Sequence, residues 1–462
     1  MTHGSISPSA GPARRALLAA GTVLAAAGCS RAAPGPADPD RPSASGPAAP
    51  DAGQTPGAMT LFKDSAFNFN GLLALGACGR GAAEVGEVLT AVNAVNAAGL
   101  SSQSYVRTFR RLGDQLMAAP RDSAADDETR RWRALRAAQY YGQALFFVLG
   151  SDRPGDEKRL YQAGRDAWDT FCGLCDPPPV TARVPYGTTP LPVWFFRPDR
   201  SDRRRPTVIL TNGSDGQNVD MWTYGVPAAL DRGWNALVYD GPGQGQLLFV
   251  DQVTFTPAWE KVVGPLIDWL SRRPDVDAGK IALTGLSMAG DLVPRAAAFE
   301  HRLAAAVAMP GCVEPWRAFP AEIREILRPS RAETNAIWNK DVVPHLPAAD
   351  AATLRKRFEP FSVPAMLAAR RGETFTDFYT PARAVQALTV TDVVSRIRTP
   401  MLVLDYEGEQ FYPGQPRELY DALRSPKDYV KLTAAEGAQL HCSPMAPQTH
   451  CEVVFDWLRQ RF

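Results

Sequence analysis

The sequence lacks an excess of charge of either sign and lacks a long apolar run. Its 462 residues carry 50 Lys and Arg against 49 Asp and Glu, which leaves a net charge of +1 at pH 7. A protein that neutralises a phosphate backbone needs a basic surplus, so the composition argues against nucleic acid as a partner. No apolar stretch reaches the roughly 20 residues that a membrane-spanning helix needs. We therefore expect a protein of two or three packed units that acts on a small molecule.

Patterns that bind metals, phosphates or redox partners are also missing. Cys172 and Cys175 form the only CxxC pair, and no second pair or neighbouring His pair completes a zinc site. A thioredoxin-type pair opens a helix after a strand, whereas this one follows a helical stretch and precedes three prolines. The glycines of residues 240–245 (DGPGQG) resemble a phosphate loop, but no Lys-Ser/Thr pair follows them, so we interpret them as a tight turn. We expect no metal and no organic cofactor, and the disulfide pairing of the six cysteines other than Cys29 stays open.

The N-terminus has the three parts of an export signal. Arg14 and Arg15 precede a 13-residue apolar run, residues 16–28, which ends in LAAAGC at Cys29. This predicts a signal peptide with a lipobox over residues 1–29, and therefore an exported protein, secreted or anchored by lipid on Cys29. The alternative is a cytoplasmic protein with an over-long start. Residues 30–59 are mostly Pro, Ala, Gly and Ser, a composition typical of a disordered linker.

The remaining chain divides by its hydrophobic pattern. Residues 60–177 show helical spacing and end in a triple proline, which predicts a helical N-terminal domain. Residues 178–310 and 397–462 alternate short β-branched runs with helices, as a mostly parallel α/β sheet requires. Residues 311–396 lie between the sixth and seventh expected strands and form a helical insertion where a lid would sit. The expected strands are 180–184, 193–196, 207–211, 236–240, 281–284, 304–308, 401–404 and 429–432, the first two of them antiparallel.

A candidate nucleophile follows the fifth expected strand. Ser287 lies in GLSMAG, directly between that strand and a helix, which is the context of a nucleophile elbow. The turn strains the serine backbone, and residues two positions away must be small to avoid neighbouring elements. Gly285 and Ala289 meet that demand.

A serine hydroxyl needs a base at neutral pH, and the chain has five histidines. His441 follows the last expected strand. A fold with a nucleophile elbow places its base in this loop, so His441 is our candidate. His450 opens the terminal helix and is the second choice; we expect it to be a partly exposed structural residue. The others lie in the leader, after the elbow helix and in the insertion: His3, His301 and His345.

The acid that orients the base belongs in the loop after the seventh strand. Three carboxylates stand there, and we expect Asp405 to lie within the strand. Glu409 is preferred and Glu407 is the alternative. The order Ser287, Glu409, His441 is that of α/β-hydrolase triads, not of chymotrypsin or subtilisin.

The oxyanion formed by serine attack needs backbone N–H donors. We expect one from Met288, directly after the nucleophile, and one from Ser214, in the loop after the third strand. Trp222 and Tyr224 follow that loop and are candidates for the pocket wall, although core packing is the commoner role of such residues.

Five segments carry a resemblance, and they occur in family order: TNGSDG, DGPGQG, GLSMAGDLVPRAAAFEHR, YEGEQFYPGQ and EGAQLHC. From about residue 60 onward the chain resembles a branch of the α/β-hydrolase superfamily with a helical N-terminal domain. That branch includes relatives of 2,6-dihydroxypseudooxynicotine hydrolase and fungal hydrolases that shorten polyketide chains. The resemblance implies a catalytic triad of Ser287, Glu409 and His441, although many members carry Asp at the position of Glu409.

The resemblance implies hydrolysis of a carboxylic ester or of a carbon–carbon bond beside a ketone. Both reactions pass through a tetrahedral oxyanion, so the triad does not separate them. We expect a serine esterase, with carbon–carbon cleavage as the alternative. A peptidase of the prolyl-oligopeptidase type shares the core but usually carries a β-propeller, whereas the N-terminal segment here is helical. A non-catalytic surface binding protein on the same scaffold is the alternative from another class. The substrate and the oligomeric state stay open.

Overall fold

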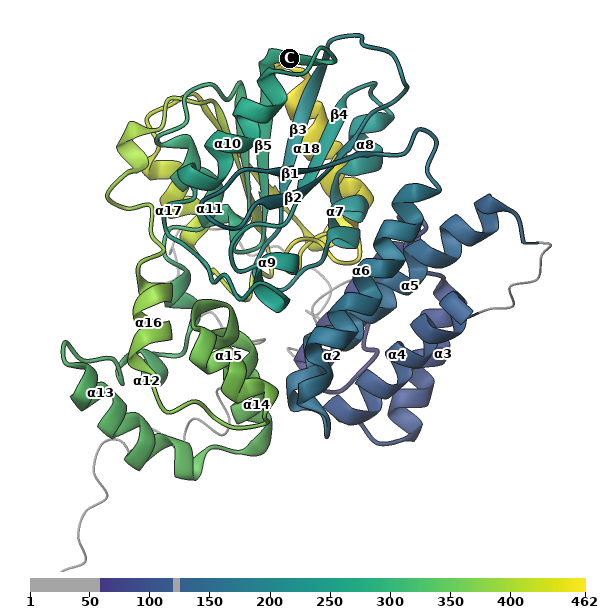
Figure 1. Ribbon diagram of the computed structural model, residues 1–462. Coiled ribbons are helices and arrows are strands. Elements are labelled where there is room, and N and C mark those ends of the chain that lie inside the picture. The colour runs from purple at the N-terminus through teal and green to yellow at the C-terminus, as the bar shows by residue number, and fades with distance from the viewer. Residues whose placement is uncertain (1–58, 119–124) are drawn as a thin grey trace, which may run out of the picture.

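A computed structural model describes residues 59–118 and 125–462. The predicted signal peptide (1–29) and all but the last residue of the predicted linker (30–59) lie outside the described residues. Three groups of elements make up the described chain: a sheet with its flanking helices, the N-terminal helices, and the helices of the insertion (Figure 1). Among the described helices, none combines the length and apolarity needed to cross a membrane.

The N-terminal helices pack around an aromatic core. They are α2 (Ser65–Gly76), α3 (Val85–Ala97), α4 (Ser102–Ala118), α5 (Asp127–Phe147) and α6 (Glu157–Gly173). Two begin at aspartate caps: the Asp64 carboxylate accepts from the N–H groups of Ala66 and Phe67, and that of Asp126 accepts from Thr129. Between these helices the buried ring of Tyr105 stacks on that of Phe109, and Phe109 contacts the buried ring of Tyr140 at a tilt of 51°.

Eight strands form one sheet, in the order β1-β2-β4-β3-β5-β6-β7-β8. β2 pairs antiparallel with β1 and β4, and the other pairs are parallel. Five strands start earlier than expected: β4 by one residue, β2, β3 and β8 by two residues each, and β5 by five. Residues 277–280 (DAGK) carry no run of large apolar side chains, which hides the start of β5. This strand pairs with β3 across a register shift. The strands are β1 (Val180–Val184), β2 (Leu191–Phe196), β3 (Arg205–Thr211), β4 (Asn235–Tyr239), β5 (Val276–Leu286), β6 (Ala305–Met309), β7 (Met401–Tyr406) and β8 (Lys427–Leu432).

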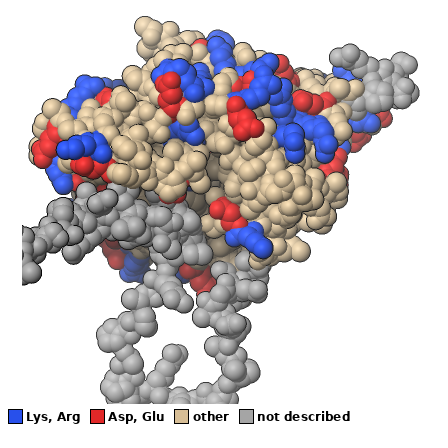
Figure 2. All heavy atoms as spheres, turned by 90° about the horizontal axis from the view of Figure 1, so that it is seen from below, with Lys and Arg blue, Asp and Glu red and all other residues tan. Residues whose placement is uncertain are grey.

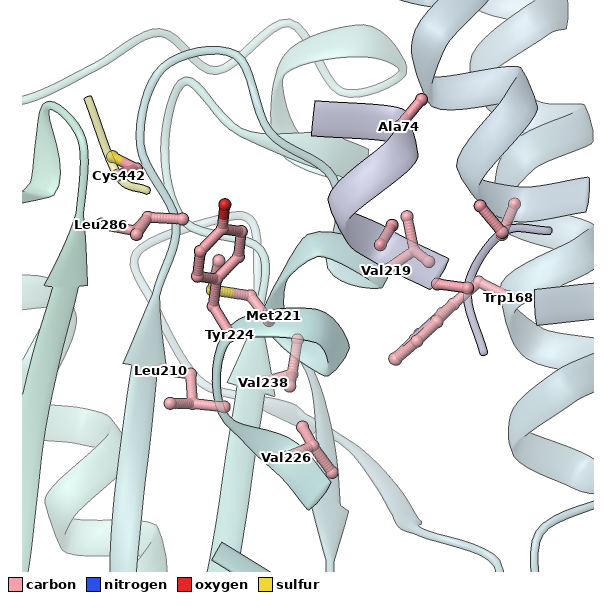
Figure 3. Close-up of a cluster of buried hydrophobic side chains, with 14 of the residues drawn as sticks. Ala74, Trp168, Leu210, Val219, Met221, Tyr224, Val226, Val238, Leu286 and Cys442 are labelled. Atoms are coloured by element: carbon pink, nitrogen blue, oxygen red, sulfur yellow. The ribbon is translucent and has the colours of Figure 1, made fainter. Parts of the chain in front are cut away.

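Alternate residues of the sheet enter two separate cores. Leu210 and Val238 pack toward α7 (Asn218–Tyr224), α8 (Val226–Leu230) and α18 (Pro447–Arg459), in the cluster drawn in Figure 3. Their neighbours Ile209 and Leu237 face the opposite core. That second core includes residues of α10 (Glu260–Ser271), α11 (Ala289–Ala297) and α17 (Gln415–Ala422). Helices therefore cover both faces, as parallel strands require.

The insertion lies between β6 and β7 and is helical, with its own aromatic centre. Trp338 is fully buried, stacks on Phe378 at 4.6 Å between ring centroids, and donates from Nε1 to the Phe375 carbonyl. Its longer helices are α13 (Arg331–Ile337), α14 (Ala348–Phe358), α15 (Val363–Arg370) and α16 (Tyr379–Gln386).

Candidate active site

Ser287 stands on a tight turn between β5 and α11. Its φ is +58°, the left-handed conformation that costs a non-glycine residue free energy. The backbone is held there because the Ser287 N–H donates to the Met309 carbonyl at 2.7 Å. A Cβ at Gly285 would lie 2.3 Å from the Ala289 carbonyl oxygen, so only glycine fits at that position. The expected backbone strain and small neighbours are both present.

The structure brings Ser287, His441 and Glu409 together. His441 Nε2 lies 2.9 Å from Ser287 Oγ, and His441 Nδ1 lies 2.9 Å from each carboxylate oxygen of Glu409. A carboxylate only accepts hydrogen bonds, so Nδ1 carries a proton and the Nε2 of a neutral imidazole is free to accept the serine proton. This is the hydrogen-bond order that serine activation requires.

A short backbone contact aligns the acid and base loops. Gly408 forms an isolated parallel bridge with Leu440, and its N–H donates to the Gln439 carbonyl at 2.8 Å. Glu409 and His441 are the next residues on each side. Glu409 Oε1 also accepts from the backbone N–H groups of Phe411 and Tyr412, at 2.8 and 3.1 Å, which fixes the carboxylate.

The other carboxylates of this loop face elsewhere. Asp405 lies in β7, as expected, and accepts from the Tyr429 hydroxyl at 2.6 Å. Glu407 is exposed and accepts from the Ala434 N–H at 2.7 Å. Of the three candidates, only Glu409 contacts the His441 ring.

The environment of His441 favours its protonated form. Burial lowers the pKa of the imidazole, but the neighbouring Cys442 and the Glu409 carboxylate outweigh burial and raise it to about 10. Stabilisation of an imidazolium is what a base needs at the moment when it holds the serine proton.

The expectation that His450 is partly exposed is wrong. The side chain is fully buried in α18, with Nδ1 3.4 Å from the Tyr406 hydroxyl and Nε2 3.2 Å from Met309 Sδ. Burial lowers its pKa to about 3, so it stays neutral. His301 and His345 are both exposed.

The loop after β3 lies against the nucleophile. A Cβ on Gly213 would lie 3.2 Å from Ser287 Oγ. The Gly213 N–H already donates to Asn212 Oδ1 at 2.8 Å, which removes it as an oxyanion donor. The N–H groups of Ser214 and Met288, the two expected donors, make no hydrogen bond to any other residue that the structure describes.

A cavity of about 680 Å³ has Ser287 and His441 in its wall. Its lining comes from all three groups of elements in Figure 1. Tyr224 lines the cavity, whereas Trp222 packs on Phe171 and donates to the Arg80 carbonyl. The other aromatic lining residues are Phe67, Phe69, Phe146, Phe147, Phe319, Phe361, Phe411 and Tyr412.

Two basic side chains of the cavity wall are paired with carboxylates. Arg357 of α14 contacts Asp215 of the oxyanion loop at 2.5 Å, and Lys356 contacts Glu359 at 2.6 Å. Burial opposes ionisation of Asp215, but the charges of Arg357 and Lys356 hold its pKa below the ordinary value. The sequence pattern did not single out these residues, because their pairing depends on how the insertion packs.

One face of the outer surface mixes charges as well. Where side chains are not drawn in grey, the face in Figure 2 carries acidic and basic groups side by side around uncharged areas. Over residues 59–118 and 125–462, no cluster of three or more His, Cys, Asp or Glu side chains could hold a metal ion.

The arrangement matches solved structures over most of the chain. It superposes on 2,6-dihydroxy-pseudo-oxynicotine hydrolase with a TM-score of 0.60 and 17% identity, covering 83% of this chain and 94% of that one. The chain has the α/β-hydrolase fold. A second match, AbyA5, has a TM-score of 0.54 and 16% identity, covering 79% of this α/β-hydrolase-fold chain and 90% of AbyA5. No protein-family model matches the sequence.

The sequence of this α/β-hydrolase-fold protein is similar to those of fungal hydrolases. It is 29% identical to 20-hydroxy-prefusarin hydrolase FUS2 of Gibberella moniliformis, over 58% of this chain and 64% of that protein. It is 30% identical to the α/β hydrolase psoB of Aspergillus fumigatus, over 54% of this chain and 59% of that protein. The chain thus spans less than two thirds of the length of these relatives.

Proposed function

We propose that the protein is a serine hydrolase that cleaves a small-molecule carboxylic ester through an acyl-enzyme intermediate. The observation that carries the proposal is the 2.9 Å contact between Ser287 Oγ and His441 Nε2, with Glu409 on the other ring nitrogen. Similarity to named fungal hydrolases supports the same class of reaction.

The proposed reaction has two halves. Ser287 Oγ attacks the substrate carbonyl while His441 Nε2 takes the serine proton, and the N–H groups of Met288 and Ser214 bind the oxyanion. The carbon–oxygen bond to the leaving group then breaks, and His441 gives its proton to the departing alkoxide. Water attacks the acyl-enzyme with the same base, releases the carboxylic acid and restores Ser287.

Carbon–carbon cleavage beside a ketone is the second candidate. It is favoured by similarity to proteins named for 20-hydroxy-prefusarin and 2,6-dihydroxy-pseudo-oxynicotine, names that mention no ester. In that reaction the electron pair of the broken bond leaves as an enolate, which takes the proton from His441. The acyl-enzyme and its hydrolysis are unchanged, so the triad serves both reactions.

Substitution of the nucleophile tests the proposal. Turnover of p-nitrophenyl esters and of β-diketones is measured for the wild type and for Ser287→Ala, together with labelling by a fluorophosphonate probe. We expect Ser287→Ala to lose labelling and to retain less than about a thousandth of the activity. The panel shows which bond is cleaved.

Ser425→Ala is the matched control, because Ser425 is also buried but lies between α17 and β8. We expect it to keep labelling and turnover. A wild type that reacts with no probe or substrate would favour the alternative of a non-catalytic surface binding protein.

A further inference from the structure

The DGPGQG turn contacts the oxyanion loop through one side chain. Gln244, 4% exposed, donates from Nε2 to the carbonyls of Asn212 and Gly213, at 2.5 and 3.1 Å. Its Oε1 accepts from the Gly241 N–H at 3.1 Å. This network fixes the orientation of the amide, because the two carbonyls require a donor and the Gly241 N–H requires an acceptor.

The contact with Gly213 decides where the next N–H points. The Gly213 carbonyl and the Ser214 N–H belong to one planar trans peptide, in which C=O and N–H point in opposite directions. A carbonyl anchored on Gln244 therefore sets the direction of the Ser214 N–H. The same hydrogen bond polarises the peptide and makes the N–H a stronger donor.

Of the two N–H groups that flank the Gly213 Cα and carbonyl, only that of Ser214 is available as a donor. Asn212 Oδ1 occupies the Gly213 N–H, and Gly213 lies so close to Ser287 that a side chain there would meet the nucleophile. Asp215, the residue after Ser214, is held from the other side by Arg357. The peptide between Gly213 and Ser214 is thus fixed in place beside the reacting oxygen.

We infer that Gln244 is a positioning residue for catalysis, which aims the Ser214 N–H at the oxyanion without touching the substrate. This inference rests on the proposed function. Loss of one oxyanion donor costs about 10²–10³ in kcat in a comparable site. A donor that is misdirected but still present should cost less, about 10- to 100-fold.

The test uses phosphonylation of Ser287 by a fluorophosphonate. In this reaction His441 takes the serine proton, the serine oxygen forms the bond to phosphorus, and fluoride leaves. The phosphoryl oxygen takes the place of the oxyanion. Gln244→Met removes the donor. Gln244→Glu keeps the shape and the acceptor for Gly241 but places a carboxylate oxygen against the two carbonyls. It provides the test if the Met variant does not fold.

We expect both Gln244 variants to slow phosphonylation about 10- to 100-fold. For p-nitrophenyl butyrate, kcat should fall by a similar factor, with KM within about twofold of the wild type.

Gln415→Met is the matched control. Gln415 is equally buried, and its Oε1 accepts from the backbone N–H groups of Val313 and Glu314, in the loop after β6. We expect it to lower the melting temperature about as much as Gln244→Met does, while phosphonylation stays within about threefold of the wild type.

Wild-type rates in a folded Gln244 variant, or equal slowing in Gln415→Met, would overturn the inference and leave the proposed function standing. A wild type that is not labelled on Ser287 at all would overturn both. The two failures are therefore distinguishable.

Discussion

Replacement of Glu409 by glutamine should move the ring proton of neutral His441 to the wrong nitrogen. In the structure Glu409 Oε1 accepts from the backbone N–H groups of Phe411 and Tyr412 and both carboxylate oxygens face His441 Nδ1. A glutamine in this place must keep its oxygen on the two N–H groups, so its NH₂ takes the place of Oε2. That NH₂ then offers a proton to Nδ1. The ring is pushed toward the tautomer that carries its proton on Nε2, which cannot accept from Ser287.

The magnitude follows from the tautomer. An amide that holds the imidazole in the wrong tautomer costs a serine protease about 10⁴ in kcat. That factor corresponds to about 5.4 kcal/mol of transition-state stabilisation. Because Oε1 also lies 2.9 Å from Nδ1, part of the variant population can keep the productive tautomer. We therefore expect Glu409→Gln to lower kcat by about 10²–10⁴, with little change in KM.

The pH profile supplies an independent readout. His441 must be neutral to accept the serine proton, and its pKa is raised above the ordinary 6.5, so activity should rise with pH along a limb that lies above 6.5. The charge of Glu409 contributes to that increase. Removal of the charge should therefore move the limb of Glu409→Gln to lower pH, even as the plateau falls.

The assay is kcat and kcat/KM for a p-nitrophenyl ester between pH 5 and 10. Glu407→Gln is the matched control, the same substitution two residues away on an exposed carboxylate, and it should match the wild type. A Glu409→Gln variant within tenfold of wild-type kcat would refute the argument. So would a Glu407→Gln variant that is equally impaired.

Two further predictions concern the cavity and the N-terminus. Arg357→Met removes the ion pair with Asp215 from the cavity wall, and we expect KM to rise several-fold in steady-state kinetics. The free energy of unfolding should fall by less than about 1 kcal/mol, because both side chains are partly exposed. Arg317→Met, which breaks an exposed pair with Glu418, should leave KM unchanged. We also propose that the mature protein starts at an acylated Cys29. Mass spectrometry of protein expressed in a bacterium with a lipoprotein pathway tests this, and an intact N-terminus would count against export.

The fold could be predicted because each strand carries a local hydrophobic pattern. The start of β5 could not be predicted, because residues 277–280 (DAGK) carry no such pattern. His450 was misjudged, although a signal existed: Cys451, Val454, Phe455 and Leu458 share its helix and are buried. The spacing of three and four residues places His450 on the same face, so its burial follows from the periodicity of the helix.

The triad candidates could be ranked from chain order, but the acid could not be fixed. Glu407 and Glu409 follow the same strand. What distinguishes Glu409 is the backbone bridge between Gly408 and Leu440, which places the next residue on each side, Glu409 and His441, together. That bridge joins loops 32 residues apart in the sequence, and no local sequence pattern predicts it. The same holds for Gln244, whose side chain reaches a loop about 31 residues earlier.

The catalytic residues and most of the aromatic residues that line the cavity come from different parts of the chain. This explains why the substrate could not be predicted from the sequence. Ser287, Glu409, His441 and the expected oxyanion donors all lie in loops at the carboxyl ends of core strands, where fold-level rules apply. Most of the aromatic lining comes instead from α2, α5 and the insertion, elements whose packing against the core no motif describes. Substitutions in those helices should therefore change which substrates are accepted while phosphonylation of Ser287 persists, whereas substitutions in the core loops should slow every substrate together.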